Sequence, residues 1–389
     1  MINLHTFVMF LTSGYVLLST SYGIAMYGLA AVSVVFMLGD VVLNGKKISK
    51  LLVWFFLSLI TIVVLSSFVN NSLNSIHSLI KMFIIISFSF FYCTVYSAKD
   101  AAKSFLNIFY IISIVSLLLY FSINLVNITI PSIQIVNSND ITYHYIGIYS
   151  YFDGFMQFRN NAIFWEPGIF ASFLVLALYM EMYFYNSERF VRVFVFFVAL
   201  ITTLSSAGIV LFFLFLLSLI IKYRVSFKII LIFAIFSLLV LGVLYMVLDV
   251  INTHSIDPMR SINKLMNPTE TERDRIESPI NLLYLFSLNS FFGLGLDGAT
   301  NEYSRLSTLS LTSTSLFYLS SFGIMSIILF MPAGAFLWTN KGRFFEALII
   351  LLMYVIIINK ELHLYFTSQY LVMFYIIDRL SQRKDMSNE

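Results

Sequence analysis

The sequence predicts an all-α, polytopic integral membrane protein, and three observations lead to that fold class. Hydrophobic residues make up 59% of the 389 positions and charged residues 11%, against roughly 45–50% and 25% in ordinary soluble domains. The apolar residues gather in runs long enough to cross a bilayer as helices, which takes about 20 residues each. Basic residues gather in the short links between alternate runs. A soluble domain of this length could not bury so much apolar surface.

The apolar runs predict about twelve spans, which we treat as one integral membrane domain over residues 1–389. The N-terminal run lacks a basic start and a small-residue cleavage site, so we interpret it as a retained first helix. Two short spans are counted near residue 205 because Ser205 to Gly208 supplies a turn and the block is too long for one span. The expected spans lie near 5–20, 22–44, 51–69, 76–97, 104–126, 166–185, 190–204, 207–222, 227–249, 312–337, 343–358 and 363–380.

Basic residues in the short links predict the orientation, since they are retained on the cytoplasmic side. In the twelve-span arrangement, 15 of the 23 basic residues fall on one side: Lys46, Lys47, Lys50, Lys99, Lys103, Arg189, Arg192, Lys222, Arg224, Lys228, Lys341, Arg343, Arg379, Arg383 and Lys384. Both termini are therefore expected to be cytoplasmic. The opposite side has mostly short, uncharged links and two long loops, about 127–165 and about 250–311, and loops of that length are usually functional.

The stretch from Arg159 to Gly168 combines an arginine, a carboxylate and a helix-start signal within ten residues. Pro167 suits the first turn of a helix, where its missing N–H costs nothing. Two interpretations of Glu166 stay open. It is a helix-start carboxylate favoured by the helix dipole and paired with Arg159, or it orients or deprotonates a substrate hydroxyl. The Arg159 guanidinium carries a fork of donors that matches phosphate oxygens.

The rest of the first long loop is polar and aromatic, and it includes Asp140, His144 and several tyrosines. Aromatic rings beside hydrogen-bonding groups suit sugar rings. The alternative is an aromatic belt at the membrane surface.

The second long loop contains a cluster of arginines and acidic residues ahead of an apolar segment, Ile280 to Leu288. Ser278 and Pro279 predict a helix start there, with Ser278 as the N-cap. Arg273 and Arg275 would then precede a helix N-terminus, which itself favours anions. The alternative is a solvated cluster with internal Glu/Asp–Arg pairs.

Gly293 to Gly298 is a weak match to a phosphate-binding loop, because the strand–helix context of such loops is missing. The other interpretation is a turn that allows close approach of two backbones. The five histidines are not at metal-ligand spacing, and Cys93 is the single cysteine, so neither a metal site nor a disulfide framework is expected.

Several of these features together resemble the O-antigen polymerases (Wzy type) and their relatives, the O-antigen ligases. The resemblance rests on the span count, the two enlarged external loops and three short motifs. These motifs are Phe164-x-Glu-Pro-Gly168 entering a helix, Leu204-Ser-Ser-x-Gly208, and Arg275 followed by Phe286 and Phe292-Gly-x-Gly295. It covers most of the chain and implies a GT-C-like membrane glycosyltransferase of the bacterial inner membrane, with both large loops in the periplasm.

The resemblance also implies a reaction and a set of site residues. A glycan on undecaprenyl diphosphate would be transferred to the hydroxyl of an acceptor sugar, and the lipid diphosphate would leave. Glu166 would orient or deprotonate that hydroxyl, with His144 and Asp140 as further candidates. No metal or other cofactor is expected, because lipid diphosphate is already a good leaving group. The arginines expected to bind the departing diphosphate are Arg159, Arg260, Arg273, Arg275 and Arg305.

Two alternatives to a polymerase of lipid-linked repeat units are an O-antigen ligase and a lipid-linked oligosaccharide flippase. Ligases typically show a His-Asn pair in the last large loop, and the matching stretch here, Ser313 to Gly323, has no histidine. Transporters place charges near the membrane midplane and often show internal repeats, whereas this chain has its charges in external loops. The expected partners are membrane lipid, the lipid-linked oligosaccharide, a chain-length regulator (Wzz type) and a flippase (Wzx type), with no nucleic acid.

Overall fold

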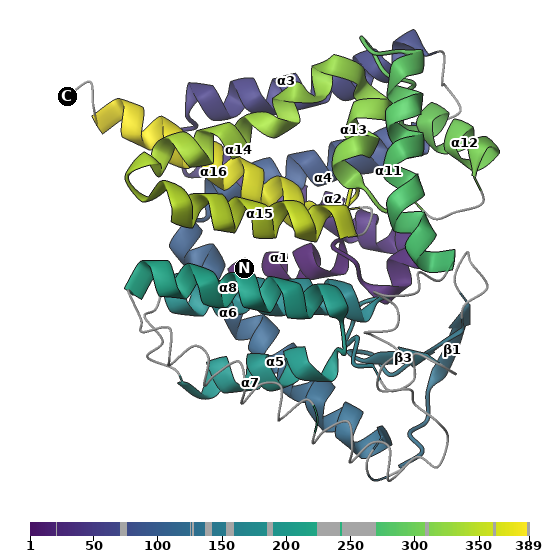
Figure 1. Ribbon diagram of the computed structural model, residues 1–389. Helices are drawn as coiled ribbons and strands as arrows, with labels where there is room; N and C mark the ends of the chain where they lie inside the picture. The colour runs from purple at the N-terminus through teal and green to yellow at the C-terminus, as the bar shows by residue number, and fades with distance from the viewer. Residues whose placement is uncertain are drawn as a thin grey trace.

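The computed structural model is a bundle of long helices with a small sheet at one end (Figure 1). It describes residues 1–20, 22–70, 76–124, 126, 128–136, 142–152, 159–184, 190–223, 242, 270–307, 311–360 and 363–386, and for 19, 184, 270–276 and 383–386 it describes the backbone alone. The expected span at 227–249, apart from Gly242, lies outside the described residues, as do Asp140 and Arg260.

Most helices follow the apolar runs, in the first part of the chain and in the later part. The first part contains α1 (Ile2–Leu11), η1 (Val16–Ser19), α2 (Gly23–Leu43), α3 (Lys50–Val69), α4 (Ile76–Val95) and α5 (Ala98–Asn124). The later part contains α6 (Pro167–Phe184), α7 (Phe190–Thr202), α8 (Ser206–Tyr223), α11 (Glu270–Leu288), α12 (Leu296–Leu306), α13 (Thr314–Phe322), η4 (Gly323–Ser326), α14 (Ile327–Thr339), η5 (Lys341–Arg343), α15 (Phe344–Lys360) and α16 (Thr367–Met386).

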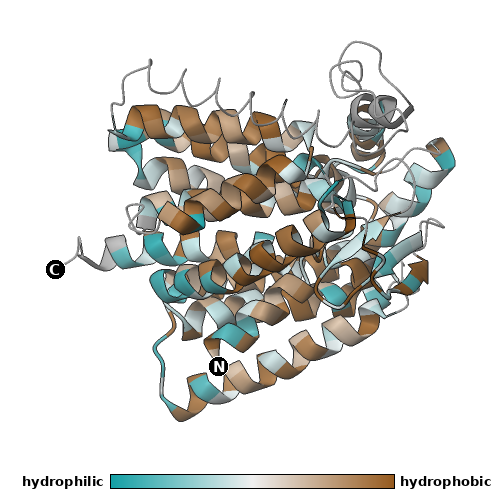
Figure 2. Ribbon diagram, turned by 90° about the horizontal axis from the view of Figure 1, so that it is seen from below, coloured by the Kyte–Doolittle hydropathy of each residue, from teal (hydrophilic) through white to brown (hydrophobic). Residues whose placement is uncertain are grey.

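Seven helical segments of the described chain are long and apolar enough to cross a membrane. They are Gly23–Leu43, Lys50–Val69, Ile76–Val95, Ala98–Asn124, Ser206–Tyr223, Thr314–Thr339 and Lys341–Lys360. Their outer faces carry exposed apolar side chains such as Trp54 and Phe68, and Figure 2 shows hydrophobic residues along most of the helices. An apolar exterior suits lipid, not water. The protein is therefore a mostly helical, multi-pass membrane protein.

Three expected elements are wrong in detail. The run at 5–20 is not one helix, because the chain leaves α1 after Leu11 and pairs Tyr15 with Phe164 in an isolated bridge. The run at 312–337 is divided into α13, η4 and α14. The helix predicted to start at Ser278 starts at Glu270 and continues through Pro279. The Ser278 hydroxyl instead accepts a hydrogen bond from the backbone N–H of Thr312 at 3.3 Å.

The break at Gly323 has a steric cause. Gly293 and Gly323 have φ angles of 69° and 60°, in the left-handed region that glycine adopts readily. At both positions a Cβ would collide with backbone of the other segment. Ile324 N–H donates to the Ser290 carbonyl at 2.7 Å. The Gly293 turn therefore lets two backbones approach closely, as the second interpretation of that motif predicts.

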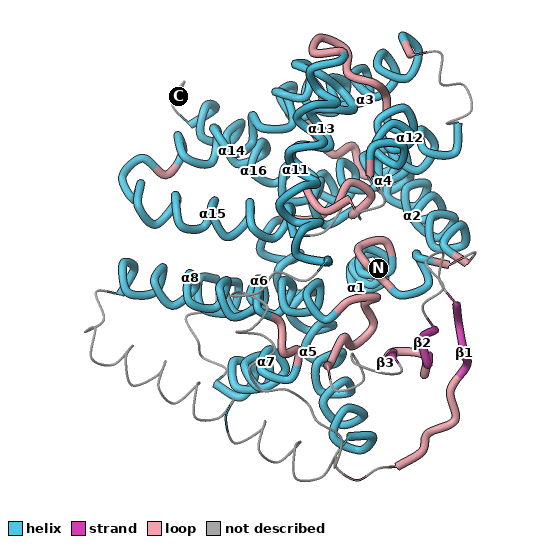
Figure 3. The backbone as a smooth tube through the Cα atoms, turned by 45° about the vertical axis from the view of Figure 1, so that its right-hand side comes forward, coloured by secondary structure: helices cyan, strands magenta, loops and turns pink. Residues whose placement is uncertain are grey.

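The described chain also contains a three-stranded antiparallel sheet, so the all-α prediction is incomplete. The strands are β1 (Ile133–Val136), β2 (Thr142–Tyr145) and β3 (Ser150–Phe152), in the order β1-β2-β3. Tyr143 pairs with Ile135 on one side and Phe152 on the other. Figures 1 and 3 show this sheet at one end of the bundle, away from the C-terminal end of α16.

Phenylalanine rings from four helices form the core beneath the sheet end. Phe10 of α1, Phe109 of α5 and Phe196 of α7 are fully buried, and the Phe109 ring contacts the other two and Phe164. Phe164 stacks on Phe173 with ring centroids 5.0 Å apart. The Arg159–Gly168 stretch is thus packed into the centre of the bundle, and this packing fixes the start of α6.

Candidate functional site at the start of α6

The backbone of the Arg159–Gly168 stretch is held by buried hydrogen bonds. Asn160 donates from its backbone N–H to the Thr202 carbonyl and from Nδ2 to the Thr202 hydroxyl, both at 3.0 Å. Asn161 Nδ2 donates to the Phe164 carbonyl at 2.8 Å. Ala162 has a φ of 49°, and its N–H donates to Asn160 Oδ1. A non-glycine residue with positive φ is uncommon, and here the two asparagine side chains support it.

Two further segments fix the residues just before Glu166. Val16 N–H donates to the Ile163 carbonyl and Trp165 N–H to the Gly14 carbonyl, at 3.0 and 3.1 Å. From the sheet, the Tyr143 hydroxyl donates to the Trp165 carbonyl at 3.3 Å. Glu166 follows directly, and α6 begins at Pro167, as predicted. Hydrogen bonds to the segment after α1 and to the sheet therefore fix the backbone that carries the Glu166 carboxylate.

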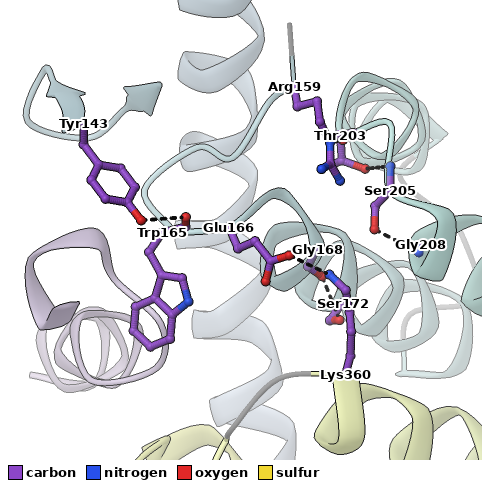
Figure 4. Close-up of polar contacts among 10 residues, drawn as sticks. All are labelled: Tyr143, Arg159, Trp165, Glu166, Gly168, Ser172, Thr203, Ser205, Gly208 and Lys360. Atoms are coloured by element: carbon purple, nitrogen blue, oxygen red, sulfur yellow. Dashed lines mark hydrogen bonds and ion pairs between the residues drawn. The ribbon is translucent and has the colours of Figure 1, made fainter. Parts of the chain in front are cut away.

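Glu166 forms an ion pair with Lys360, the last residue of α15. Oε1 and Nζ are 3.7 Å apart, and the side chains are 20% and 7% exposed (Figure 4). A Cβ on Gly168 would overlap the lysine ammonium, so Gly168 provides the space in which Lys360 lies. The sequence prediction offered Arg159 as the partner of Glu166 and did not foresee Lys360. One feature of the sequence could have pointed to Lys360. It is a basic residue in a short link on the side of the membrane where the short links are otherwise uncharged.

Arg159 lies beside the turn between α7 and α8, where its Nε donates to the Thr203 carbonyl at 3.2 Å (Figure 4). Ser205 Oγ accepts from the Gly208 N–H at 3.3 Å, which confirms the predicted capping turn. A Cβ on Gly208 would be 2.8 Å from Ala171 Cβ. Since this turn packs closely on Ala171, Arg159 is held at a turn that contacts α6, the helix that begins directly after Glu166.

His363 is a further buried group near this ion pair. It is 4% exposed, and its ring centroid is 4.3 Å from that of Phe366. Its backbone N–H donates to the Thr314 hydroxyl at 2.7 Å. Burial, and to a smaller extent the charge of Lys360, lower its pKa from 6.5 to about 3, although Glu166 acts in the opposite direction. The imidazole is therefore neutral at physiological pH. From the sequence, His363 is only one of five histidines that are not at metal-ligand spacing, so no role is predicted for it.

The depressed pKa of His363 predicts acid sensitivity. The unfolded chain binds a proton at this residue near pH 6.5 and the folded chain only near pH 3. Stability should thus be complete above about pH 6.5 and fall by on the order of 1 kcal/mol per pH unit between those values. Thermal unfolding of the detergent-solubilised protein across this range, compared with His363→Gln, measures the effect. Equal slopes for the two proteins would contradict it.

Two further predicted site residues, His144 and Arg305, lie on other elements. His144 lies on β2 and bonds through Nδ1 to the Ser132 hydroxyl at 2.9 Å, with its ring stacked on Tyr151. Successive strand residues point to opposite faces, so His144 points away from the face on which Tyr143 contacts Trp165. Arg305, on α12, is 74% exposed and pairs with Glu302.

Two of the other predicted arginines lie within a helix. Arg273 and Arg275 lie inside α11, not ahead of its start, and only their backbone is described. Arg260 and Asp140 are outside the described residues. Arg159 is thus the one predicted diphosphate ligand that the described contacts connect to α6, through the α7–α8 turn.

Comparisons with known proteins add no family assignment. No protein-family model matches the sequence, and no curated protein matches it. Within the described part of the chain, no group of three or more His, Cys, Asp or Glu residues could hold a metal ion. The site is accordingly defined by its geometry: a carboxylate and a buried ammonium at the first turn of α6, and a guanidinium at the α7–α8 turn that packs on α6.

Proposed function

We propose that the protein is a membrane glycosyltransferase that polymerises oligosaccharide repeat units carried on undecaprenyl diphosphate. The observation that carries this proposal is the ion pair of Glu166 with Lys360 in a multi-pass membrane protein, with Arg159 held at the α7–α8 turn that packs on α6. The reaction would take place at the periplasmic face of the bacterial inner membrane, with both termini in the cytoplasm. A Wzz-type chain-length regulator and a Wzx-type flippase would be its functional partners.

The proposed reaction is a displacement at the anomeric carbon of the donor sugar. The acceptor hydroxyl oxygen forms the new bond to that carbon, and its proton passes to the Glu166 carboxylate. The bond from the carbon to the diphosphate oxygen breaks, and the lipid diphosphate leaves with the electron pair. Arg159 and Lys360 offset the negative charge that develops on it. These residues need no metal for their part of the reaction.

The pairing of Lys360 with Glu166 supports both roles. A nearby ammonium favours the ionised form of a carboxylate, which is the form that accepts a proton. Since both side chains are largely withdrawn from water, their charges interact more strongly than on an exposed surface. An arriving diphosphate would share Lys360 with Glu166, so that donor binding and release of the carboxylate for proton transfer are coupled.

Gene deletion separates this function from the alternatives. A strain without the polymerase should carry single repeat units on lipid A–core when its surface polysaccharide is separated on a gel. Loss of a flippase or a ligase would leave no repeat units there. A normal ladder would contradict all three assignments.

Complementation of the deletion strain tests Arg159. Arg159→Ala should leave single repeat units while the protein still accumulates in the membrane, because the guanidinium fork is lost. Arg343→Ala, an exposed arginine in η5, is the matched control and should restore the full ladder. Wild-type chain lengths with Arg159→Ala would remove the diphosphate role from this residue.

A further inference from the structure

A second cationic centre lies on α4. The Lys81 ammonium lies 5.6 Å from the ring centroid of Tyr27 and 5.9 Å from that of Tyr365. The lysine is half-buried, and no ion pair joins it to a carboxylate within the described residues. Aromatic faces offset part of the cost of desolvating an ammonium but use none of its three N–H donors. The arrangement leaves these donors available to an anion.

The groups around Lys81 are polar and hydrogen-bonding. Ser78, one turn earlier on α4, donates to Asp297 Oδ1 at 2.8 Å. Burial raises the pKa of Tyr365 to about 12, against the opposing effect of a hydrogen bond with Ser78. The phenol therefore keeps its proton at physiological pH and can donate. An ammonium, two aromatic faces, a phenol donor and a carboxylate acceptor suit an anion that is attached to a sugar.

The centre at Lys81 is joined to the site at Glu166 by one short segment, the link from His363 to Phe366 between α15 and α16. Tyr365 faces Lys81, and the ring of its neighbour Phe366 lies 5.3 Å from that of Trp165, which precedes Glu166. Figure 3 shows α2, α4 and α12 close together at the end of the bundle that carries these groups. The link therefore contacts Lys81 through Tyr365 and the segment before Glu166 through Phe366.

We infer that Lys81, with Tyr27 and Tyr365, binds the diphosphate of a second isoprenyl-diphosphate-linked glycan, the acceptor substrate. The inference rests on the proposed function. In the donor, the diphosphate is attached to the reacting carbon and must lie at Glu166. In the acceptor, the remaining sugars of the repeat unit separate the reacting hydroxyl from its own diphosphate. An acceptor diphosphate site must therefore lie at other residues than Glu166, and Lys81 contacts Tyr27 of α2 and Tyr365.

Binding stoichiometry tests this assignment without enzymatic activity. Calorimetry with farnesyl diphosphate, a short isoprenyl diphosphate without sugar, should give two sites on the wild type and one on Lys81→Met, while Lys81→Arg keeps both. The lost contact should weaken the second site by about 10- to 100-fold. Lys222→Met is the matched control, because that lysine also contacts aromatic rings, those of Tyr183 and Tyr223, but lies on α8. It should keep both sites.

Three outcomes would overturn the inference. They are a single site on the wild type, two unchanged sites on folded Lys81→Met, or inorganic pyrophosphate filling the Lys81 site as tightly as the isoprenyl compound. The last would assign the site to soluble phosphates.

Kinetics distinguish this inference from the proposed function. In a reaction with separate donor and acceptor, Lys81→Met should raise KM for the acceptor by about 10-fold or more and leave KM for the donor unchanged. Polymerisation with equal acceptor KM in both proteins would refute the acceptor site alone. A wild type that makes no polymer, but has two isoprenyl-diphosphate sites of which one depends on Lys81, would refute the polymerase and support the site.

Discussion

Replacing Glu166 by glutamine is expected to slow chain extension by about 100- to 10,000-fold, the range that general acid–base groups contribute. Glutamine keeps the shape of the side chain but cannot accept the proton of the acceptor hydroxyl. It also removes the charge that Lys360 faces at 3.7 Å. The rate is measured with the purified protein and a lipid-linked repeat unit, and the length distribution is measured on a gel after complementation.

Two further variants show whether a slower rate in Glu166→Gln is due to the loss of this carboxylate. Glu302→Gln removes a carboxylate from the α12 surface, where it pairs with Arg305, and it should not change the rate. Lys360→Met should slow the reaction too, and the double variant should be no slower than Glu166→Gln if the two residues act as a unit. Wild-type activity of Glu166→Gln would leave this residue only the helix-start role.

The sequence predicts best those helices whose length is set by the thickness of the bilayer. The helices α2, α3, α4 and α8 are close to their expected spans because the length of an apolar run reflects the thickness to be crossed. The run at 5–20 failed because its course depends on Phe164, far away in the chain, which pairs with Tyr15. Contacts of that kind leave no periodic signal in either segment.

The candidate site was predictable to a similar degree. The Arg159–Gly168 stretch is recognisable because a helix start, a carboxylate and an arginine are neighbours in sequence. The partner of Glu166 cannot be recognised in this way, because Lys360 is far from it in the sequence. A basic residue at the end of a helix is also common without any functional role. Only the packing of α15 against the first turn of α6 gives it a role, and that packing depends on Gly168 having no side chain.

Gly168→Ala is expected to be as damaging to chain extension as Glu166→Gln, although it removes no chemical group. Alanine is a better helix former than glycine by about 1 kcal/mol, so an isolated α6 would gain stability. In the protein, the added methyl group would overlap the Lys360 ammonium. The ammonium is the far end of a flexible side chain, so the lysine moves out of this space and its ion pair with Glu166 breaks. We expect the free energy of unfolding in detergent to change by less than about 1 kcal/mol, because the better helix propensity of alanine offsets the lost ion pair.

Gly334→Ala, in α14, is the matched control, because no heavy atom lies within 4 Å of a Cβ built there. It should be neutral or slightly stabilising. Combining Gly168→Ala with Lys360→Ala removes the overlap, so the double variant should be as stable as Lys360→Ala. It should still extend chains slowly, because the ammonium is missing. This separation distinguishes a functional Lys360 from one that only fills space. If Gly168→Ala alone extends chains at the wild-type rate, Lys360 does not need the space at the start of α6 that its roles require.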